Sequence, residues 1–221
     1  MAFRYAYLHG FLSSPQSYKG LELQRRLLKN SLHMEILDMS LGKGCEGLTY
    51  SSGLQAITNF FEDTHHKGEK LRLVGSSLGG YISARYAELH PDRVDRIVLL
   101  NPGLSLLDRW PERLGEKEMH LWKKRGFRDF KRNKEDIRMP YDFIKDAERH
   151  PLVPKITRPT LILHGKYDEV IPIQAARDVK HMHPEDVTLI EMDDDHAMMK
   201  HKSLNLIEKK VVSFFGISQP T

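Results

Sequence analysis

The stretch of sequence that decides the fold reads Leu71-Arg72-Leu73-Val74-Gly75-Ser76-Ser77-Leu78-Gly79-Gly80. It joins an apolar run, too short for a helix, to a segment of helical length, and so sets the pattern G-x-S-x-G between a strand and a helix. Because the chain must reverse there within about two residues, we expect Ser77 at the tip of the turn in a strained conformation. Side chains at Gly75 and Gly79 would clash with neighbouring backbone. The following helix points its amide groups and positive dipole end at the same place.

Short apolar runs alternate along the chain with amphipathic stretches of helical length. The runs predicted as strands are Phe3–Leu8, His33–Leu37, Leu71–Gly75, Arg96–Leu100, Thr160–His164 and Val187–Glu191. The stretches predicted as helices are Tyr18–Lys29, Ser52–His65, Leu78–His90, Ile173–His181 and Ser203–Phe215. This alternation predicts a parallel sheet that is covered on both faces. Ligands of such sheets bind beyond the carboxyl ends of the strands, so the informative residues are those just after each strand.

We therefore predict the α/β fold class, as one domain over residues 1–221 with a mainly parallel sheet of about six strands flanked by helices. The segment from Asn101 to about Pro159 breaks the alternation. It is polar, lacks a convincing strand and is longer than a crossover between strands needs. We interpret it as a small helical cap, at about residues 103–150, that lies over the strand ends.

Two further polar residues follow predicted strands. Asp168 comes after Thr160–His164 in His164-Gly165-Lys166-Tyr167-Asp168, and His196 comes after Val187–Glu191 in Asp193-Asp194-Asp195-His196. On these residues and the G-x-S-x-G pattern, in the order serine, acid, histidine, the chain resembles the α/β-hydrolase family over nearly its whole length. The resemblance implies that Ser77 is the nucleophile, His196 the general base and Asp168 the acid that orients His196.

A further match to the family lies directly after the first predicted strand, in His9-Gly10-Phe11. In the family this position supplies one donor of the oxyanion hole, here the backbone N–H of Phe11, and the residue after the nucleophile, Leu78, supplies the other. Each such donor contributes on the order of 3 kcal/mol. The resemblance thus implies a small esterase or acyl thioesterase that hydrolyses a small-molecule ester or thioester through an acyl-enzyme, with no cofactor and no metal.

Two other functions stay open. The same triad hydrolyses carbon–carbon bonds next to a ketone in some relatives, and a binding protein can use this fold without catalysis. A binding protein would be marked by a missing triad member, and none is missing here.

The acidic turn before His196 offers rivals to Asp168, namely Asp193, Asp194 and Asp195. We expect the side chain of Asp195 to point away from His196, because the two residues are adjacent. The turn, together with His201, holds metal-binding residue types but no known ligand spacing, so we predict no metal site.

The composition is that of a globular protein, with 40% hydrophobic and 29% charged residues and a net charge of +4. The single cysteine, Cys45, cannot form an internal disulfide, which favours a reducing compartment such as the cytoplasm. No run approaches the roughly 18 apolar residues of a membrane span. The N-terminus reads as a strand rather than as a signal peptide. The sequence leaves a homo-oligomer open.

Positive charge gathers in the predicted cap. Between Arg109 and Arg138 the sequence carries eleven Lys or Arg and six Asp or Glu, a local net charge of +5. We interpret the run Lys123–Arg132, where aromatic and basic residues mix, as an amphipathic cap helix rather than a nucleic-acid contact. The aromatic residues Trp122, Phe127 and Phe130 are expected in the pocket or between cap and core. If the charges face the strand ends, the cap favours anionic substrates.

Overall fold

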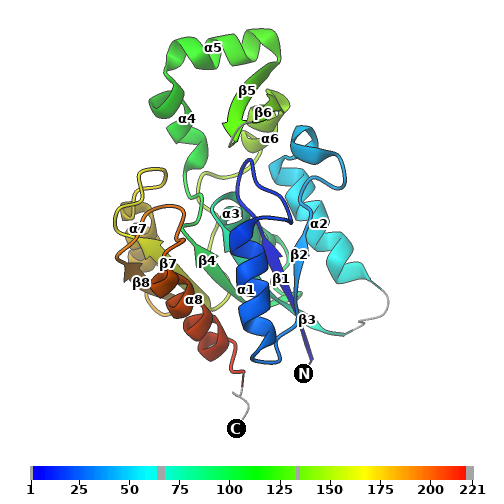
Figure 1. Ribbon diagram of the computed structural model, residues 1–221, viewed down its shortest axis with the longest axis vertical. Helices are drawn as coiled ribbons and strands as arrows, with labels where there is room; N and C mark the ends of the chain where they lie inside the picture. Colours follow the sequence, from blue (N-terminus) through cyan, green and yellow to red (C-terminus); the bar gives the residue numbers. More distant parts are fainter. Residues whose placement is uncertain (1, 64–67, 133–134, 218–221) are drawn as a thin grey trace.

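A computed structural model describes residues 2–63, 68–132 and 135–217 and contains a six-stranded parallel sheet (Figure 1). The strands of the sheet are β1 (Phe3–Leu8), β2 (Met34–Leu37), β3 (Lys70–Ser76), β4 (Val94–Leu100), β7 (Thr160–Gly165) and β8 (Val187–Met192). Their order across the sheet is β2-β1-β3-β4-β7-β8. The predicted parallel sheet is confirmed, and every predicted strand is present.

Helices cover both faces of the sheet, as the alternation predicts. They are α1 (Tyr18–Leu28), α2 (Tyr50–Glu62), α3 (Leu78–Leu89), α7 (Gln174–Met182) and α8 (His201–Phe214). A short 3₁₀ helix, Gly44–Gly47, precedes α2. The helix predicted to reach His65 ends at Glu62, and His65 itself lies outside the described residues.

Two apolar cores lie on the two faces of the sheet. Successive residues of a strand point to opposite faces, so Tyr7 joins one core while Ala6 and Leu8 join the other. The Tyr7 core packs under α1 and α8, and the other core packs under α2, α3 and α7. Because both faces are buried, the strands are apolar on both sides, which is why the sequence shows them as near-continuous apolar runs.

The segment between β4 and β7 forms a cap at the end of the sheet opposite the two chain termini (Figure 1). It contains α4 (Leu106–Leu114), α5 (Glu116–Arg125), β5 (Phe127–Arg132), β6 (Glu135–Pro140) and α6 (Asp142–Ala147). The helices were expected. The antiparallel hairpin of β5 and β6 was not, and the absence of strands predicted for this segment is wrong.

Charged residues within the hairpin explain why the sequence pattern did not predict it. Asp129 and Arg138 lie opposite each other and form an ion pair, with Oδ1 and Nε 2.9 Å apart. Lys131 and Asp136 form a second pair across the strands. Phe130 instead packs on Trp122, with ring centroids 5.3 Å apart. Charged residues thus face each other in three of the six cross-strand pairs, and apolar pairs such as Phe130 with Ile137 are too few to show the regular alternation by which strands are recognised.

The glycines of the turn at Ser77 generate a prediction about stability. A Cβ at Gly79 would lie 2.3 Å from the Leu8 carbonyl oxygen, whereas a Cβ at Gly42, where φ is +81°, would meet nothing within 4 Å. We expect Gly79→Ala to lower the free energy of unfolding by about 3 kcal/mol, because β1 and α3 must separate. Gly42→Ala is the control and should cost about 1 kcal/mol from backbone strain alone. Urea unfolding measures both, and equal losses would contradict the tight packing at Gly79.

Candidate active site

The turn between β3 and α3 holds Ser77 in an uncommon backbone conformation, with φ 54° and ψ −118°. The strain predicted for this residue is confirmed. Two hydrogen bonds fix it: the Ser77 N–H donates to the Leu100 carbonyl at 2.9 Å, and the Gly103 N–H donates to the Ser77 carbonyl at 2.8 Å. A Cβ at Gly75 would lie 2.2 Å from the Gly79 carbonyl oxygen, so the turn closes only with glycine there.

The three residues predicted as a triad lie in one hydrogen-bonded line. The Nε2 atom of His196 is 3.0 Å from the Ser77 Oγ atom, and its Nδ1 atom is 2.7 Å from the Asp168 Oδ2 atom. These residues come from three loops that follow β3, β7 and β8 at the same end of the sheet. The line joins a hydroxyl to a base, and the base to a carboxylate, which is the arrangement that activates a serine.

Asp168 is buried and held as a carboxylate. Its Oδ1 atom accepts hydrogen bonds from the N–H groups of Val170 and Ile171, both at 2.8 Å, and the Nε2 atom of His164 lies 3.4 Å from its Oδ2 atom. Burial opposes the negative charge, but the hydrogen bonds from His164 and His196 outweigh it, so the pKa of Asp168 is well below its usual range. Asp168 is therefore a carboxylate at neutral pH and can stabilise a positive charge on His196.

The rival carboxylates face elsewhere. Asp194 is buried and accepts a hydrogen bond from the Ser203 hydroxyl at the start of α8. Asp195 accepts from the N–H of Ala197 at 2.9 Å, and Asp193 lies 3.3 Å from the ammonium of Lys202. Asp195 thus points away from the histidine ring, as predicted.

Asn101, the first residue of the segment that was expected to contain the cap, connects the loops of the site. Its side chain is fully buried at the end of β4. Its Nδ2 atom donates to the carbonyls of Asp195 and His196 at 3.0 and 2.9 Å, and its Oδ1 atom accepts from the Gly165 N–H at 2.8 Å. One amide therefore fixes the loop of the histidine against the strand that leads to Asp168. A buried asparagine directly after a strand was the signal available in the sequence.

The loop after β1 passes directly over Ser77. A Cβ at Gly10 would lie 3.4 Å from the Ser77 Cβ atom, and the next residue, Phe11, lines the same hollow as Ser77. Leu78 is the first residue of α3, and its N–H points out of the helix N-terminus. Among the described residues, neither amide donates a hydrogen bond to the protein. Both of the amides predicted for the oxyanion hole are thus unengaged beside Ser77.

The cap packs onto this loop through aromatic rings. The Phe11 ring lies 5.1 Å from Trp110, 5.4 Å from Phe130 and 4.9 Å from Phe143, measured between ring centroids. Trp122 joins the same cluster. The predicted cap–core contact is confirmed for Phe130, whereas Trp122 packs within the cap on Trp110 and Phe127 lies under the guanidinium of Arg138. The single helix predicted over Lys123–Arg132 is wrong, because α5 ends at Arg125 and Phe127–Arg132 forms β5.

A hollow of about 290 Å³ opens beside the nucleophile. It is lined by residues from the loop after β1, the start of α1, the turn at Ser77 and the loop after β8, including Phe11, Lys19, Ser77, His196 and Met199. None of its lining residues comes from α5. The basic residues Lys123, Lys124 and Arg125 are instead exposed at the end of that helix (Figure 1).

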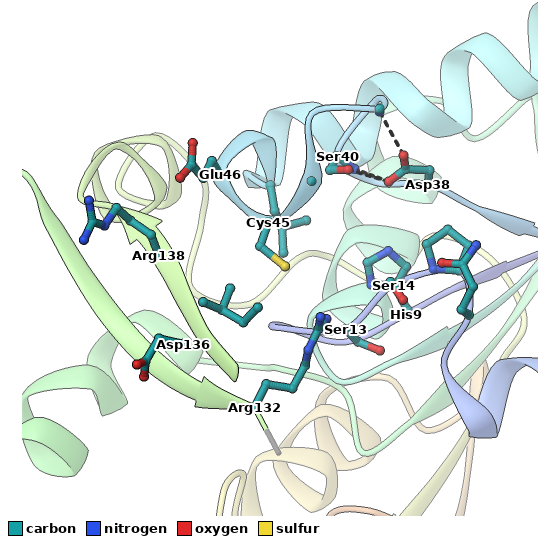
Figure 2. A pocket seen from close by; sticks show the side chains of 16 residues that line it. His9, Ser13, Ser14, Asp38, Ser40, Cys45, Glu46, Arg132, Asp136 and Arg138 are labelled. Atoms are coloured by element: carbon teal, nitrogen blue, oxygen red, sulfur yellow. Dashed lines mark hydrogen bonds between the residues drawn. The ribbon is translucent and has the colours of Figure 1, made fainter. Parts of the chain in front are cut away.

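A second hollow, of about 480 Å³, is lined by His9, Ser13 and Ser14 after β1 together with residues of the cap, and Ser77 is not among its lining residues (Figure 2). Cys45 reaches toward it from the short 3₁₀ helix, and Arg132 reaches toward it from β5. Burial raises the pKa of the Cys45 thiol, which keeps it protonated and unreactive at neutral pH. This agrees with a cysteine that takes no part in the chemistry.

Within residues 2–63, 68–132 and 135–217, no three His, Cys, Asp or Glu side chains gather in a way that could hold a metal ion. The described helices also include none with the length and apolar character required to cross a membrane.

The fold and the arrangement of this site define an α/β hydrolase. Mouse alpha/beta hydrolase domain-containing protein 10 superimposes with a TM-score of 0.74 at 25% identity, covering 97% of this chain and 89% of that one. A family model matches residues 4–215, and the chain belongs to the family that it describes, the uncharacterised protein family UPF0227. Est1E from Butyrivibrio proteoclasticus shares the fold, with a TM-score of 0.74 at 19% identity over 97% of this chain and 88% of Est1E.

Curated relatives carry hydrolase names. The mitochondrial palmitoyl-protein thioesterase ABHD10 of Mus musculus is 30% identical over 143 residues, which is 61% of this chain and 48% of the relative. The monoacylglycerol lipase abhd6-B of Xenopus laevis is 26% identical over 214 residues, which is 76% of this chain and 62% of the relative. The chain thus spans about half to two thirds of the length of these relatives.

Asp168 and Asp195 are expected to differ in their effect on turnover, because Asp168 contacts His196 whereas Asp195 bonds within its own turn. Asp168→Asn should lower the turnover of an activated ester by roughly 10³- to 10⁴-fold, because His196 loses its orientation and its charge partner. Asp195→Asn should cost less than about tenfold, since that side chain only accepts hydrogen bonds within its own turn. Steady-state kinetics of the two variants test this, and a reversed order would remove Asp168 from the triad.

Asn101 should matter through His196 rather than through the substrate. We expect Asn101→Ala to lower kcat by about 10- to 100-fold with little change in KM, because the histidine loop loses two hydrogen bonds that hold it in register. Asn101→Asp keeps the shape but sets a carboxylate against two carbonyls, so it should be no better. Circular dichroism verifies that Asn101→Ala is folded. An unchanged kcat in the folded variant would show that the histidine loop keeps its position without the two hydrogen bonds from Asn101.

Proposed function

We propose that this protein is a serine hydrolase that cleaves a carboxylic ester or thioester through an acyl-enzyme intermediate. The observation that carries the proposal is the continuous hydrogen-bonded line from the Ser77 hydroxyl through His196 to Asp168. A serine hydroxyl is a poor nucleophile at neutral pH, and a base in contact with it removes its proton during attack.

The first step forms the acyl-enzyme. The Ser77 Oγ atom attacks the carbonyl carbon while Nε2 of His196 takes the hydroxyl proton, and charge develops on the carbonyl oxygen. The N–H groups of Phe11 and Leu78 are the donors proposed to meet that oxygen. The positive end of the α3 dipole acts in the same direction. The imidazolium of His196, stabilised by Asp168, then gives its proton to the departing alcohol or thiol.

The second step releases the acid. Water takes the place of the leaving group, His196 removes its proton, and the resulting hydroxide attacks the acyl carbon. The bond to Ser77 breaks as His196 returns the proton to the Ser77 oxygen. No group besides the three residues and the two amides is needed for either step.

The names of the relatives support both an alcohol and a thiol as the leaving group. A thioesterase and a monoacylglycerol lipase stand among them, one a hydrolase of thioesters and the other of oxygen esters. A binding protein without catalysis is the weaker alternative, because all three side chains are present and in contact. The single cysteine supports a reducing compartment such as the cytoplasm as the place of action.

Replacement of the nucleophile tests the function. Ser77→Ala should reduce hydrolysis of 4-nitrophenyl butyrate to near background, a loss on the order of 10⁶-fold by analogy with other triads. The exposed Ser213 in α8 provides a matched control, and Ser213→Ala should keep full activity.

A fluorophosphonate probe locates the reactive serine directly. Mass spectrometry should find the adduct on Ser77 in the unmodified protein and no adduct in the Ser77→Ala variant. An adduct on Ser76, Ser13 or Ser14 would give the nucleophile to another residue, and no adduct at all would argue for a binding protein.

A further inference from the structure

Lys19 lies beside the nucleophile, in the first turn of α1. Its Nζ atom is 3.2 Å from the hydroxyl of Ser76, the residue before Ser77, and the lysine lines the same hollow as Ser77 and His196. No local sequence pattern indicates this, because position 19 becomes part of the site only through the packing of α1 against β1 and β3.

The ammonium of Lys19 is partly buried but has fewer hydrogen-bond and ion-pair partners than a buried charge normally has. Of its three N–H donors, one is used within the part of the chain that the structure describes, and its acceptor is a neutral hydroxyl. Among the described residues no carboxylate lies within 4.0 Å of the Nζ atom, although buried charges in proteins are normally paired.

Other charged and titratable groups face Lys19 only from a distance. They are Asp168 after β7 and Asp194 and Asp195 after β8, together with His196, while the Tyr7 hydroxyl of β1 lies under Ser76. Burial lowers the pKa of Lys19 to about 8, and the three carboxylates only partly oppose that effect. Lys19 is therefore mostly charged at neutral pH and loses its charge in mildly alkaline solution.

The N-terminus of α1, the helix that carries Lys19, also favours a negative charge nearby. No side chain caps the N-terminus of α1, and its first turn contains no acidic residue. Ser17 and Tyr18 line the hollow next to Lys19. The free amides and the positive dipole end of α1 thus act in the same direction as the ammonium.

Three cations of the cap differ from Lys19 in this respect. Arg128 is paired with Glu118, Lys131 with Asp136, and Arg138 with Asp129. Among the described residues that line the hollow beside Ser77, Lys19 is the one lysine or arginine. A direct contact between a cation and a substrate in this hollow is therefore available from α1.

We propose that Lys19 is a specificity-determining residue that binds an anionic group of the substrate, a carboxylate or a phosphate, while Ser77 attacks the ester or thioester carbonyl. This proposal rests on the function proposed above. Lys19 would exchange its distant carboxylates for a direct, charge-assisted hydrogen bond to the substrate. The alternative is that Lys19 only positions Ser76 and offsets the charge of the nearby aspartates, in which case it affects all substrates alike.

Matched ester pairs distinguish where the anion belongs. In the first pair the leaving group is 4-nitrophenol, and the acyl group is glutarate with a free carboxylate or with a methyl ester. In the second set the acyl group is butyrate, and the leaving group is 3-hydroxybenzoate, 3-hydroxyphenyl phosphate or the neutral 3-hydroxybenzamide. Preference in the first pair assigns the anion to the acyl group, and preference in the second assigns it to the leaving group.

The variants are Lys19→Met, Lys19→Arg and the control Lys29→Met, which removes an exposed charge just beyond the other end of α1. We expect Lys19→Met to lower kcat/KM for the preferred anionic ester by about 10- to 100-fold, mainly through KM, and to change the neutral partner by less than about threefold. Lys19→Arg should keep most of the preference, and Lys29→Met should behave as the unmodified protein does. Thermal unfolding verifies that each variant is folded.

The pH dependence of the unmodified protein gives a second test that needs no variant. A lysine loses its positive charge as pH rises, so the preference for the anionic ester should be large at pH 7 and small at pH 9.5. The carboxylate of the ester stays ionised throughout. In Lys19→Met the ratio of the two esters should not change with pH.

The outcomes separate the two proposals. Equal rates for anionic and neutral esters, or equal losses for both in Lys19→Met, would overturn the role of Lys19 while leaving the hydrolase intact. An absence of Ser77-dependent hydrolysis of every ester, including neutral 4-nitrophenyl butyrate, would instead overturn the hydrolase function and the role of Lys19 with it.

Discussion

The close approach of α3 to the ends of β1 and β3 is the constraint on which the site depends. Gly79 meets the Leu8 carbonyl and Gly75 meets the Gly79 carbonyl, so neither position has room for a side chain. The turn between them gives Ser77 its positive φ, and α3 begins at the next residue, Leu78. The backbone thus fixes the position of the Ser77 hydroxyl and of the first amide of α3 together, which is the preorganisation that the proposed acyl transfer requires.

The histidine and the acid depend on a second layer of contacts. Asp168 and His196 follow neighbouring strands, but a strand end does not by itself fix the position of a loop. Asn101 supplies that position, because it bonds to the backbone on both sides of the gap between β7 and the histidine loop. Its own strand, β4, also holds the Ser77 amide through Leu100. The positions of Ser77, Asp168 and His196 are therefore all set by contacts with the end of β4.

The sequence predicts those parts of the molecule that follow from local pattern and chain order. The strands were readable because both faces of the sheet are buried, and Ser77, Asp168 and His196 were readable because each directly follows a strand. The hairpin of β5 and β6 was not, since ion pairs such as Asp129 with Arg138 replace its apolar alternation. Asn101 and Lys19 were missed for another reason. Asn101 was marked only by its place directly after a strand and Lys19 by no local pattern, because their roles come from packing between elements far apart in sequence.

The cap and α1 divide the surroundings of Ser77 by chemistry. On the cap side the ring of Phe11 is enclosed by Trp110, Phe130 and Phe143, so the loop that offers an oxyanion donor is held by apolar packing. On the α1 side the hollow next to Ser77 is open and contains the ammonium of Lys19. If Phe11 supplies an oxyanion donor, as proposed, a movement of the cap would disturb its amide and with it the rate of the chemical step. If Lys19 binds an anionic group, a change in α1 would alter which substrates bind, so the two proposals place turnover and selectivity in separate parts of the structure.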